Sequence, residues 1–245
     1  MNTPTSTAPR LLIHGASGRM GRALLRLAAE RADLQVVAAY SRSQPAQRVI
    51  EGVPHFAASE LNGAPEFDVA IDFSLPEGFD PVLALCAARG KALVSGTTGL
   101  SSAQNAAINQ ASADIAVVWA ANYSLGVAVL TELVRRAAAA LPEWDCDVIE
   151  AHHTRKLDAP SGTALHLGAA AAIGRGEQPH YASLRAGDIV GEHTVQFAAA
   201  GERLELIHRA TNRDIFARGA LEAALRVAHQ APGRYGLAEL MFPNL

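Results

Sequence analysis

The sequence predicts an α/β fold in its first half and an α+β arrangement in its second half. In the first half, short apolar runs alternate with helical patterns, which is typical of βαβ units around a parallel sheet. After about Asn122, long alanine-rich helical patterns and runs that alternate apolar with polar residues indicate helices and half-covered antiparallel strands. The 245 residues are 49% hydrophobic and 18% charged, so the chain can bury a large core and most of it is not disordered.

The first half contains a regular series of strand candidates. The segment between the first two places Met20, Leu24 and Leu27 at helical spacing with arginines between them, which predicts an amphipathic helix. This alternation predicts a Rossmann-type domain. The strands are expected at Leu11–Ile13, Leu34–Ala39, Phe67–Phe73, Ala92–Ser95 and Ile115–Ala121.

The second half mixes helices and strands. A helix is expected over Val127–Ala140, before Pro142, and a second helix is expected to begin near Ser161. A further helical pattern that begins at Phe216 leads to the end of the chain. Strands are expected at Cys146–Ala151, Glu192–Ala198 and Arg203–Arg209, the last two antiparallel.

Charge and composition exclude several classes of partner. Lys and Arg number 21 against 24 Asp and Glu, a net charge of −3, so no basic surplus exists to bind nucleic acid. No apolar run approaches the roughly 18 residues that a membrane span needs, and residues 1–10 are polar, so a frayed tail is expected instead of a signal peptide. Cys86 and Cys146 fit neither a disulfide framework nor a zinc site, which favours a reducing cytoplasm.

A glycine-rich loop, GASGRMG at residues 15–21, follows the first strand and leads into the first helix. In dinucleotide-binding loops, glycines turn the chain, let the backbone approach the pyrophosphate and allow the helix to pack closely on the strand. The helix N-terminus adds a positive end for the phosphates. The spacing G-x-x-G-x-x-G is less common than G-x-G-x-x-G, so a plain glycine turn is the alternative, but the flanking strand and helix favour dinucleotide binding.

The end of the second strand suggests which dinucleotide is used. Roughly twenty residues after the last glycine, NAD-binding domains usually carry an acid for the ribose hydroxyls, and here that position is Ser41. Arg42 follows it and offers a guanidinium beside the hydroxyls of Ser41 and Ser43, groups that suit a 2′-phosphate. We therefore expect NADPH to be preferred, with NADH possible; a solvated loop arginine is the alternative.

Later strands of the parallel sheet also end in polar or glycine-containing loops. These are Ser74–Glu77, Gly96–Gly99 and Asn122–Ser124. Ligands of α/β sheets bind at the carboxyl ends of the strands, so these loops could line the nicotinamide end of the cofactor. Each could equally be a turn or a helix cap.

The densest set of reactive side chains lies in Glu150–Thr163, EAHHTRKLDAPSGT. Histidine exchanges protons near neutral pH, and a lysine can donate a proton and attract a carboxylate. Gly162 and Thr163 would present backbone N–H groups at a helix N-terminus, which suits a small anionic substrate with carboxylates. No third ligand is evident for zinc, and a polar strand end with a solvated loop is the remaining alternative.

This segment resembles the signature of the 4-hydroxy-tetrahydrodipicolinate (dihydrodipicolinate) reductase family of lysine and diaminopimelate biosynthesis. The resemblance covers most of the chain, because HGASGRMG, GTTG, AANYSLGV, RAGDIVGEHTVQFAAAGERLELIHRA and FARGAL occur in the same order. It implies a dinucleotide-binding domain, residues 1–123 and 213–245, and a substrate-binding domain, residues 124–212, that assembles a homotetramer.

The resemblance also implies the roles of individual residues. His152 would donate or accept a proton and Lys156 would donate one, while substrate carboxylate would be held by His153, Gly162 and Thr163. Metal is not expected. The pyrophosphate would be held by Gly15, Ala16, Ser17, Gly18, Arg19 and Met20, and the nicotinamide side by Gly96, Thr97, Thr98, Ala120, Ala121, Asn122 and Tyr123.

The implied reaction is the NAD(P)H-dependent reduction of 4-hydroxy-tetrahydrodipicolinate, a cyclic dicarboxylate, to tetrahydrodipicolinate. Hydride would go to C4 of the ring after loss of water, and the His152 and Lys156 dyad would protonate the adjacent carbon. The chain departs from the family where Ser41 and Arg42 replace an acid followed by arginine, and where Tyr123 replaces phenylalanine. Two rivals remain: an aspartate-dehydrogenase-like imine reductase, and a nucleotide-sensing protein without catalysis.

Overall fold

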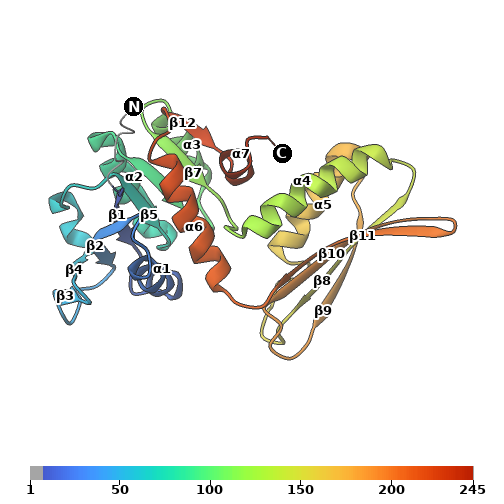
Figure 1. Ribbon diagram of the computed structural model, residues 1–245, viewed down its shortest axis with the longest axis horizontal. Helices are drawn as coiled ribbons and strands as arrows, with labels where there is room; N and C mark the ends of the chain where they lie inside the picture. Colours follow the sequence, from blue (N-terminus) through green and yellow to red (C-terminus); the bar gives the residue numbers. More distant parts are fainter. Residues whose placement is uncertain (1–7, 245) are drawn as a thin grey trace. The chain divides into compact units, whose positions relative to one another are not determined.

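The computed structural model describes residues 8–244 and divides into two compact units (Figure 1). One unit contains the chain up to Tyr123 together with Phe216–Pro243, and the other contains Ser124–Ile215. The polar tail expected at the start of the chain falls largely on residues 1–7, which lie outside the described residues.

The first unit is built on an eight-stranded sheet in the order β12-β7-β6-β5-β1-β2-β4-β3. All neighbours are parallel except β3 and β4, and the five strands expected from the sequence are confirmed, with ends shifted by at most two residues. The strands are β1 (Arg10–His14), β2 (Gln35–Ser41), β3 (Val49–Ile50), β4 (Val53–Ala57), β5 (Val69–Asp72), β6 (Ala92–Ser95), β7 (Ala116–Trp119) and β12 (Gly233–Tyr235).

Helices cover both faces of this sheet, so its central strands are apolar throughout. Leu11, Leu12 and Ile13 of β1 are all fully buried, as expected for a parallel strand with two covered faces. One core cluster joins Leu12, Phe79 and Ile108, from β1, α2 and α3. The remaining elements of this unit are α1 (Arg19–Ala29), η1 (Ala58–Gly63), α2 (Pro76–Arg89), α3 (Ser102–Ala111), α6 (Asp214–Val227) and α7 (Leu237–Met241).

The strand order places a topological switch point between β1 and β5. The chain runs from β1 to β2 on one side and later returns to add β5, β6 and β7 on the other side. Loops that follow β1 and β5 therefore diverge at the carboxyl edge of the sheet and leave a crevice for a ligand. The glycine loop and residues 73–76 are the two segments that meet there.

The stretch 42–67 contains elements that the sequence pattern does not reveal. The strands β3 and β4 form a short hairpin, and β4 then pairs in parallel with the end of β2. Pro54 and His55 interrupt the apolar character of β4, and Val49 and Ile50 of β3 are exposed. The sequence of these two strands therefore has no strand pattern, and pairing of β4 with β2 stabilises them.

The second unit is a four-stranded mixed sheet in the order β11-β10-β8-β9, with α4 and α5 packed side by side on one face (Figure 1). The strand β10 is antiparallel to β11, as expected, and it is also antiparallel to β8, whereas β9 is parallel to β8. The elements are α4 (Leu125–Ala140), β8 (Asp145–His152), α5 (Gly162–Arg175), β9 (His180–Arg185), β10 (Gly191–Ala199) and β11 (Glu202–Ala210).

The covered face of this sheet changes from apolar to polar along its length. Phe197 of β10 lies opposite Cys146 of β8, and Val195 opposite Val148, and these residues pack in the core beneath α4 and α5. The next row is His193 opposite Glu150. Because side chains alternate between the faces of a strand, Glu150 and His152 continue the buried row and lie at the end where α5 begins.

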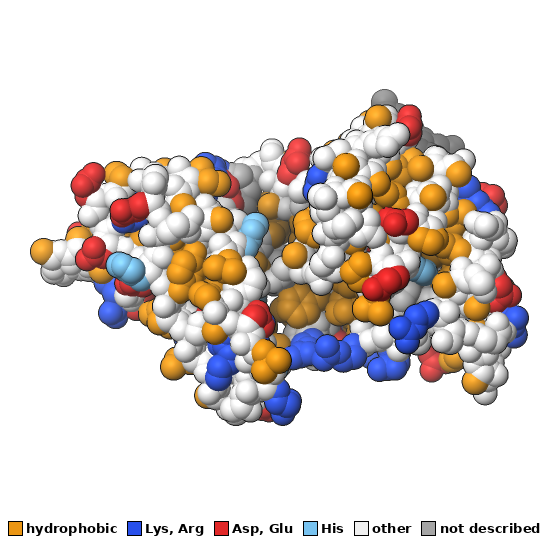
Figure 2. All heavy atoms as spheres, turned by 180° about the vertical axis from the view of Figure 1, so that it is seen from behind, with side chains coloured by type: hydrophobic (Ala, Val, Ile, Leu, Met, Phe, Trp, Pro, Cys, Tyr) orange, Lys and Arg blue, Asp and Glu red, His pale blue; other side chains and the backbone are white. Residues whose placement is uncertain are grey.

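The outer surface carries both apolar patches and charges. Hydrophobic side chains are interspersed with acidic and basic ones on the face drawn in Figure 2. The most exposed large hydrophobic residues among the described ones are Leu157, Ile173, Leu184 and Val49. No helix within residues 8–244 combines the length and the apolar character needed to cross a membrane.

Candidate functional site

The glycine loop of the first unit is shaped by close backbone packing. Gly15 has φ of +84°, and a Cβ there would collide with the carbonyl group of Phe73. A Cβ at Gly21 would collide with the carbonyl oxygen of Gly15. The backbone N–H groups of Gly15 and Ala16 both donate to the carbonyl oxygen of Tyr40 at 2.9 Å. The loop is thus pressed between β2 and β5, which leaves Ser17, Gly18 and Arg19 exposed at the start of α1.

A cavity of about 410 Å³ opens at the switch point of the sheet. Its lining combines the glycine loop with the start of α2, and Phe73 and Ser74 border it from the loop after β5. Arg42 borders it from the end of β2. Bare loop backbone, a helix N-terminus and a guanidinium in one crevice suit an anionic dinucleotide.

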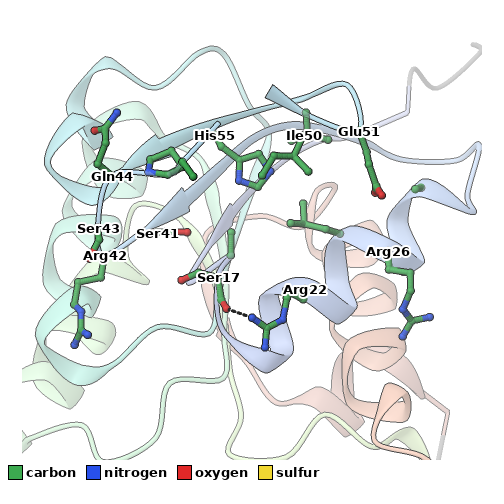
Figure 3. Close-up of a pocket in the computed structure, with 16 residues that line it drawn as sticks. Ser17, Arg22, Arg26, Ser41, Arg42, Ser43, Gln44, Ile50, Glu51 and His55 are labelled. Atoms are coloured by element: carbon green, nitrogen blue, oxygen red, sulfur yellow. Dashed lines mark hydrogen bonds between the residues drawn. The ribbon is translucent and has the colours of Figure 1, made fainter. Parts of the chain in front are cut away.

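A second cavity of about 640 Å³ lies between α1 and the β3–β4 hairpin (Figure 3). Ser17 and Arg42 line both cavities, so one elongated ligand that contacts these two residues could occupy both. Arg22 points back toward the glycine loop, where its Nη1 donates to the carbonyl oxygen of Ser17 at 2.8 Å. Polar groups of the lining also include Arg26, Ser41, Ser43, Gln44, Glu51 and His55.

A buried histidine–carboxylate pair lies at the ends of β1 and β5. Nδ1 of His14 is 2.8 Å from Oδ1 of Asp72, and the two residues are 3% and 0% exposed. Asp72 also accepts hydrogen bonds from the N–H of Ser74 at 3.1 Å and from the hydroxyls of Ser95 and Thr97 at 2.9 and 2.7 Å. Burial works to raise the pKa of the Asp72 carboxyl, but the His14 contact and the other donors outweigh it and lower that pKa. This network ties three strand ends together.

The residues expected on the nicotinamide side lie at the ends of β6 and β7. The Thr97 hydroxyl is taken by Asp72, and the buried Tyr123 hydroxyl donates to the carbonyl oxygens of Ser95 and Val118 at 2.9 and 3.0 Å. A Cβ at Gly96 would collide with the Phe73 ring. Because these hydroxyls bond within the protein, a ligand at this place would contact the backbone of the loops and not the two hydroxyls. Thr98 and Ala121 are exposed, and Ala120 and Asn122 are partly buried.

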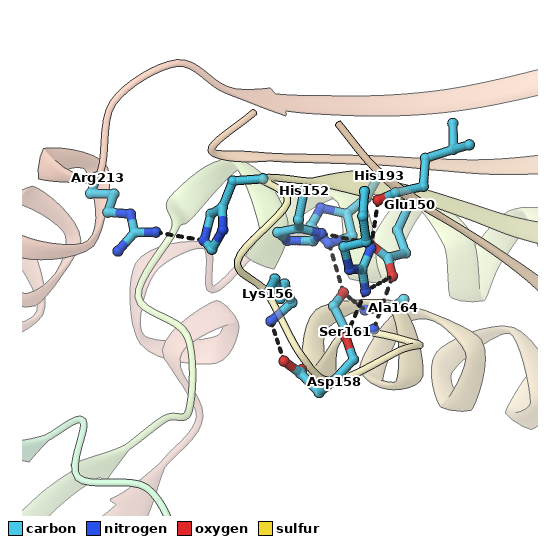
Figure 4. A network of polar contacts seen from close by, with 11 residues as sticks. Glu150, His152, Lys156, Asp158, Ser161, Ala164, His193 and Arg213 are labelled. Carbon is cyan, nitrogen blue, oxygen red and sulfur yellow. Dashed lines mark hydrogen bonds and ion pairs between the residues drawn. The ribbon is translucent and has the colours of Figure 1, made fainter. Parts of the chain in front are cut away.

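In the second unit, the polar end of the sheet centres on Glu150 and His152 (Figure 4). Oε2 of Glu150 lies 2.5 Å from Nδ1 of His152, and the two residues are 1% and 8% exposed. Arg185, opposite His152 on β9, donates to both carboxylate oxygens of Glu150 at 2.9 and 2.7 Å. The carboxylate is thus shared between a guanidinium and an imidazole in a buried setting.

The start of α5 is attached to the same cluster. The N–H of Ser161 donates to Oε1 of Glu150 at 3.3 Å, and the Ser161 hydroxyl caps the helix by accepting from the N–H of Ala164 at 3.2 Å. Nε2 of His193 is 3.2 Å from that hydroxyl. Gly162 is exposed, and a Cβ there would meet no atom within 4 Å, so open space lies beside the helix start. An anion can approach the first N–H groups of α5 from that side.

The other candidate residues of the segment surround this centre. Lys156 forms an ion pair of 2.9 Å with Asp158, whose pKa is lowered by that contact. Nη2 of Arg213 lies 3.1 Å from Nε2 of His153, which is half-buried. Partial burial and the Arg213 charge lower the pKa of His153. The structure thus gathers His152, His153, Lys156 and the helix start at Gly162 and Thr163 in one unit.

Burial and charge set the protonation of the cluster. Burial works to raise the pKa of Glu150, but hydrogen bonds from Arg185, Ser183 and His152 outweigh it and bring the pKa to about 2. Burial lowers the pKa of His152, Lys156 and Arg185 lower it further, and Glu150 opposes them. Burial and the neighbouring histidines lower the pKa of His193 to about 4. At neutral pH the centre therefore holds an ionised Glu150 and neutral histidines.

Several residues of these centres have no role in the sequence interpretation. Glu150 and Ser161 lie in the recognised segment, and the spacing of Glu150 two residues before His152 on a strand was an available signal. Arg185 lies on β9, which has mostly exposed residues and no apolar pattern. His14 and Asp72 come together only through the pairing of β1 with β5. Within the described residues, no group of three or more His, Cys, Asp or Glu side chains is arranged to hold a metal.

Two family models match consecutive parts of the chain. The model described as "Dihydrodipicolinate reductase, N-terminus" matches residues 9–123, and the model described as "Dihydrodipicolinate reductase, C-terminus" matches residues 126–241. Together they cover both units, including the glycine loop and the Glu150–Thr163 segment.

Individual relatives agree with these matches. A 4-hydroxy-tetrahydrodipicolinate reductase of Stenotrophomonas maltophilia (strain R551-3) is 70% identical over 96% of this chain and 98% of its own. One from Xanthomonas axonopodis pv. citri is 68% identical over 97% and 99%. Among solved structures, a dipicolinate-bound dihydrodipicolinate reductase from Paenisporosarcina sp. TG-14 has a TM-score of 0.80 at 22% identity and covers 93% of this chain and 97% of its own. The diaminopimelate dehydrogenase of C. glutamicum shares the fold, with a TM-score of 0.61 at 14% identity and coverage of 98% and 97%.

Proposed function

Because the chain belongs to the dihydrodipicolinate reductase family, we propose that one of its units binds the cofactor of a reductase and the other binds the substrate. The chain is an oxidoreductase of diaminopimelate and lysine biosynthesis, and it reduces 4-hydroxy-tetrahydrodipicolinate with a nicotinamide dinucleotide. The family resemblance of its motifs is confirmed. The roles of individual residues, given below, are our proposals.

A dinucleotide fits the first unit. Gly15 and Gly21 leave no room for side chains, and the exposed Ser17 and Gly18 border a cavity at the start of α1. We assign the pyrophosphate to the loop Gly15–Met20 and the nicotinamide side to residues 96–98 and 120–123. The Thr97 and Tyr123 hydroxyls bond within the protein, so these two residues would act through their backbone and through packing.

Arg42 supports a preference for NADPH. The ribose of the adenosine half lies at the end of the second strand of such domains, and there the chain offers Ser41, Arg42 and Ser43 instead of an acid. Arg42 borders both cavities, and Arg22 lines the larger one (Figure 3). A 2′-phosphate in this region would find a guanidinium and hydroxyl donors and no acid at the position that usually binds the ribose of NAD.

The second unit supports binding of a cyclic dicarboxylate. The start of α5 offers N–H groups at Gly162 and Thr163 with open space beside them, and His153 lies in the same unit beside Arg213. Dipicolinate, a planar pyridine dicarboxylate, is the molecule bound in the relative from Paenisporosarcina. We assign one substrate carboxylate to the helix start and His153, because two aligned N–H groups and a positive helix end match an anion.

The proton chemistry is assigned to His152 and Lys156. When bound, the nicotinamide supplies a hydride to C4 of the substrate ring. The electron pair that this addition leaves on the adjacent ring carbon must take up one proton from the enzyme. Lys156 is the proton donor, and His152, neutral with Nε2 available, relays or accepts a proton. The buried pairing of His152 with Glu150 is the observation that carries this assignment, because it leaves one ring nitrogen uncommitted.

The division into a dinucleotide-binding domain and a substrate-binding domain, the homotetramer and the cytoplasm as compartment remain predictions. For assembly, the uncovered face of the second sheet is the candidate surface. Ile207 opposes Thr194 on that face, and Leu184 opposes Ala151. Leu184 and Ile207 are 59% and 43% exposed, which is high for large apolar residues in a sheet.

A coupled assay tests the proposed function. The unstable cyclic substrate is generated in the cuvette from pyruvate and aspartate semialdehyde by its synthase, and oxidation of NADPH and then NADH is followed. Rapid oxidation with an advantage for NADPH is expected, because Ser41 stands where an acid is usual and Arg42 follows it. Oxidation with oxaloacetate and ammonia instead would favour an imine reductase, and nucleotide binding without any oxidation would favour a sensing protein.

A further inference from the structure

We propose that Glu150 is a positioning residue for catalysis: its carboxylate fixes the proton of His152 on Nδ1, presents Nε2 to the substrate and ties this ring to the anion-binding start of α5. The proposal rests on the proposed function, because it takes His152 and the helix start as parts of the site. It adds a residue to the reaction that motif reasoning left without a role.

The first step of the argument is the tautomer of His152. An ionised carboxylate only accepts hydrogen bonds, so the 2.5 Å contact between Oε2 of Glu150 and Nδ1 of His152 requires the proton on Nδ1. In the neutral ring, Nε2 then carries the lone pair. Among the described residues, no hydrogen-bond partner of His152 Nε2 is found. The ring is held at one nitrogen and free to exchange a proton at the other.

The second step concerns the space around Nε2. A Cβ added to Gly191 would lie 3.1 Å from Nε2 and 3.4 Å from Cδ2 of His152. Gly191 therefore leaves room beside the free nitrogen that any other residue would fill. A ring nitrogen with an open side is suited to a ligand or a transferred proton.

The third step is how a carboxylate stays ionised in this buried place. Arg185 donates to both oxygens of Glu150 and also to the carbonyl oxygen of Asp158 at 2.6 Å, so three hydrogen bonds hold the guanidinium against the carboxylate. The pKa of Glu150 is accordingly low, at about 2. Ionised Glu150 favours the imidazolium form of His152 when a proton arrives, while Lys156 and Arg185 favour its release.

The fourth step links the two halves of the substrate site. Oε2 of Glu150 faces His152, and Oε1 accepts from the N–H of Ser161, the residue that caps α5. His193 supports the cap through its contact with the Ser161 hydroxyl, and its ring lies 5.2 Å from that of His152 (Figure 4). One carboxylate therefore sets the position of the proton-transfer ring relative to the N–H groups that would hold the substrate carboxylate.

The charged and titratable groups around His152 come from each packed element. They are Glu150 on the same strand, Arg185 on β9, His193 on β10, His208 on β11 and Lys156 with Asp158 in the following loop. Of these groups, Glu150 is the one in hydrogen-bond contact with Nδ1 of His152, and the other carboxylate, Asp158, is paired with Lys156. A change in His152 tautomer on replacement of Glu150 would thus report on Glu150 itself.

The first test is the ¹⁵N spectrum of the wild-type protein near neutral pH, in which the His152 signals are identified by their loss in His152→Asn. The inference expects a protonated Nδ1 and an unprotonated Nε2. A proton on Nε2 would overturn it, and this result needs no variant of Glu150 to fold.

The second test uses Glu150→Gln, which keeps the size of the side chain and removes its charge, with Glu150→Asp as the conservative variant. We expect kcat to fall by about 10²-fold in the glutamine variant, since loss of a catalytic histidine's carboxylate partner can cost up to about 10⁴-fold. The Kd of dipicolinate should change much less, the pH profile of kcat should shift, and aspartate should restore part of the activity.

The matched control is Glu177→Gln, which removes the charge of an exposed glutamate that pairs with the largely buried Arg175 in the same unit. It should leave the kcat profile and the His152 spectrum unchanged. A Glu150→Gln protein that is less stable but has wild-type kcat, pH profile and His152 tautomer would make the Glu150–Arg185 pair merely structural and overturn the inference. Full activity in His152→Asn would instead reject the catalytic assignment on which the inference rests, whatever Glu150 does.

Discussion

Each unit of the molecule buries a histidine–carboxylate pair, at the carboxyl ends of β1 and β5 in the first unit and of β8 in the second, and the two pairs differ in their third partner. In the first unit, Asp72 binds His14 and neutral donors, the Ser95 and Thr97 hydroxyls and a backbone N–H. In the second unit, Glu150 binds His152 and the guanidinium of Arg185. Around Asp72, the neutral donors form a hydrogen-bond network that holds the loops after the strands together. Around Glu150, Arg185 binds the carboxylate, and Nε2 of His152 remains available for proton transfer. The groups that surround a histidine–carboxylate pair therefore determine whether the pair has a structural or a catalytic role.

The largest expected effect concerns Lys156, the proposed proton donor in the second unit. Lys156→Ala should lower kcat by about 10²- to 10⁴-fold, because it removes the proposed proton donor, and general acids contribute about that much. The measurement is the coupled assay at saturating NADPH. Arg136→Ala, which changes an exposed basic residue of α4, serves as the control. An unchanged kcat would remove Lys156 from the mechanism.

The next effect concerns stability in the first unit. Asp72→Asn removes the charge that His14 and the hydroxyls share in a fully buried place, and breaking such a pair costs about 3 kcal/mol in the free energy of unfolding. Urea unfolding measures it. Asp33→Asn, which breaks an exposed pair with Arg31, should change stability little. Equal effects of the two substitutions would contradict a structural role for Asp72.

The next prediction concerns cofactor preference, which we assign to the first unit. Arg42→Ala should lower kcat/KM for NADPH by about 10- to 100-fold, the value of one or two charge-assisted hydrogen bonds, and leave NADH nearly unaffected. Arg48→Ala, which alters an exposed arginine of the same region that pairs with Glu60, is the matched control. An unchanged ratio of kcat/KM for NADPH to that for NADH in Arg42→Ala would contradict the proposal that Arg42 binds the 2′-phosphate.

A smaller effect is expected at the start of α5. Thr163→Leu should raise the KM for substrate by about tenfold, with little change in kcat. The larger apolar side chain would obstruct the carboxylate at the helix start, and loss of one modest polar contact is worth about 1.4 kcal/mol. The split between KM and kcat is the readout. An unchanged KM would argue against binding of a substrate carboxylate at this helix start.

The smallest effect is the pH dependence of stability that the second unit contributes. His193 has its pKa lowered to about 4 from a usual 6.5, so between these values the unfolded chain binds the extra proton and the folded one does not. Stability should therefore fall as pH decreases through this window. In His193→Asn the slope should be smaller, as measured by urea unfolding from pH 7 to 4. An identical slope would show that His193 is not kept neutral by the fold.

Local patterns account for much of the fold. The glycine loop, the strands of the parallel sheet and the capped start of α5 at Ser161 all follow from short stretches, because a buried parallel strand is apolar throughout and a serine cap precedes a helix. The hairpin of β3 and β4 and the edge strand β9 do not. Their residues are mostly polar or exposed, so only pairing with β2 and β8 makes them strands.

The candidate site was predictable to the same extent. His152, Lys156 and the helix start lie within fourteen residues, so one segment reveals them. Arg185 and His193 reach the same centre from other strands, through the register of β9 and β10 against β8. A single sequence carries no direct record of that register. The pairing of His14 with Asp72 depends in the same way on β1 lying beside β5.

The most direct test of the account compares His14→Asn with His152→Asn in the coupled assay, with thermal unfolding of both. The two substitutions remove the same group from the two buried pairs. We predict a fall in kcat of about 10²-fold or more for His152→Asn, and for His14→Asn a fall of less than about tenfold with a lower unfolding temperature. The reverse order of the two kcat values would contradict the account.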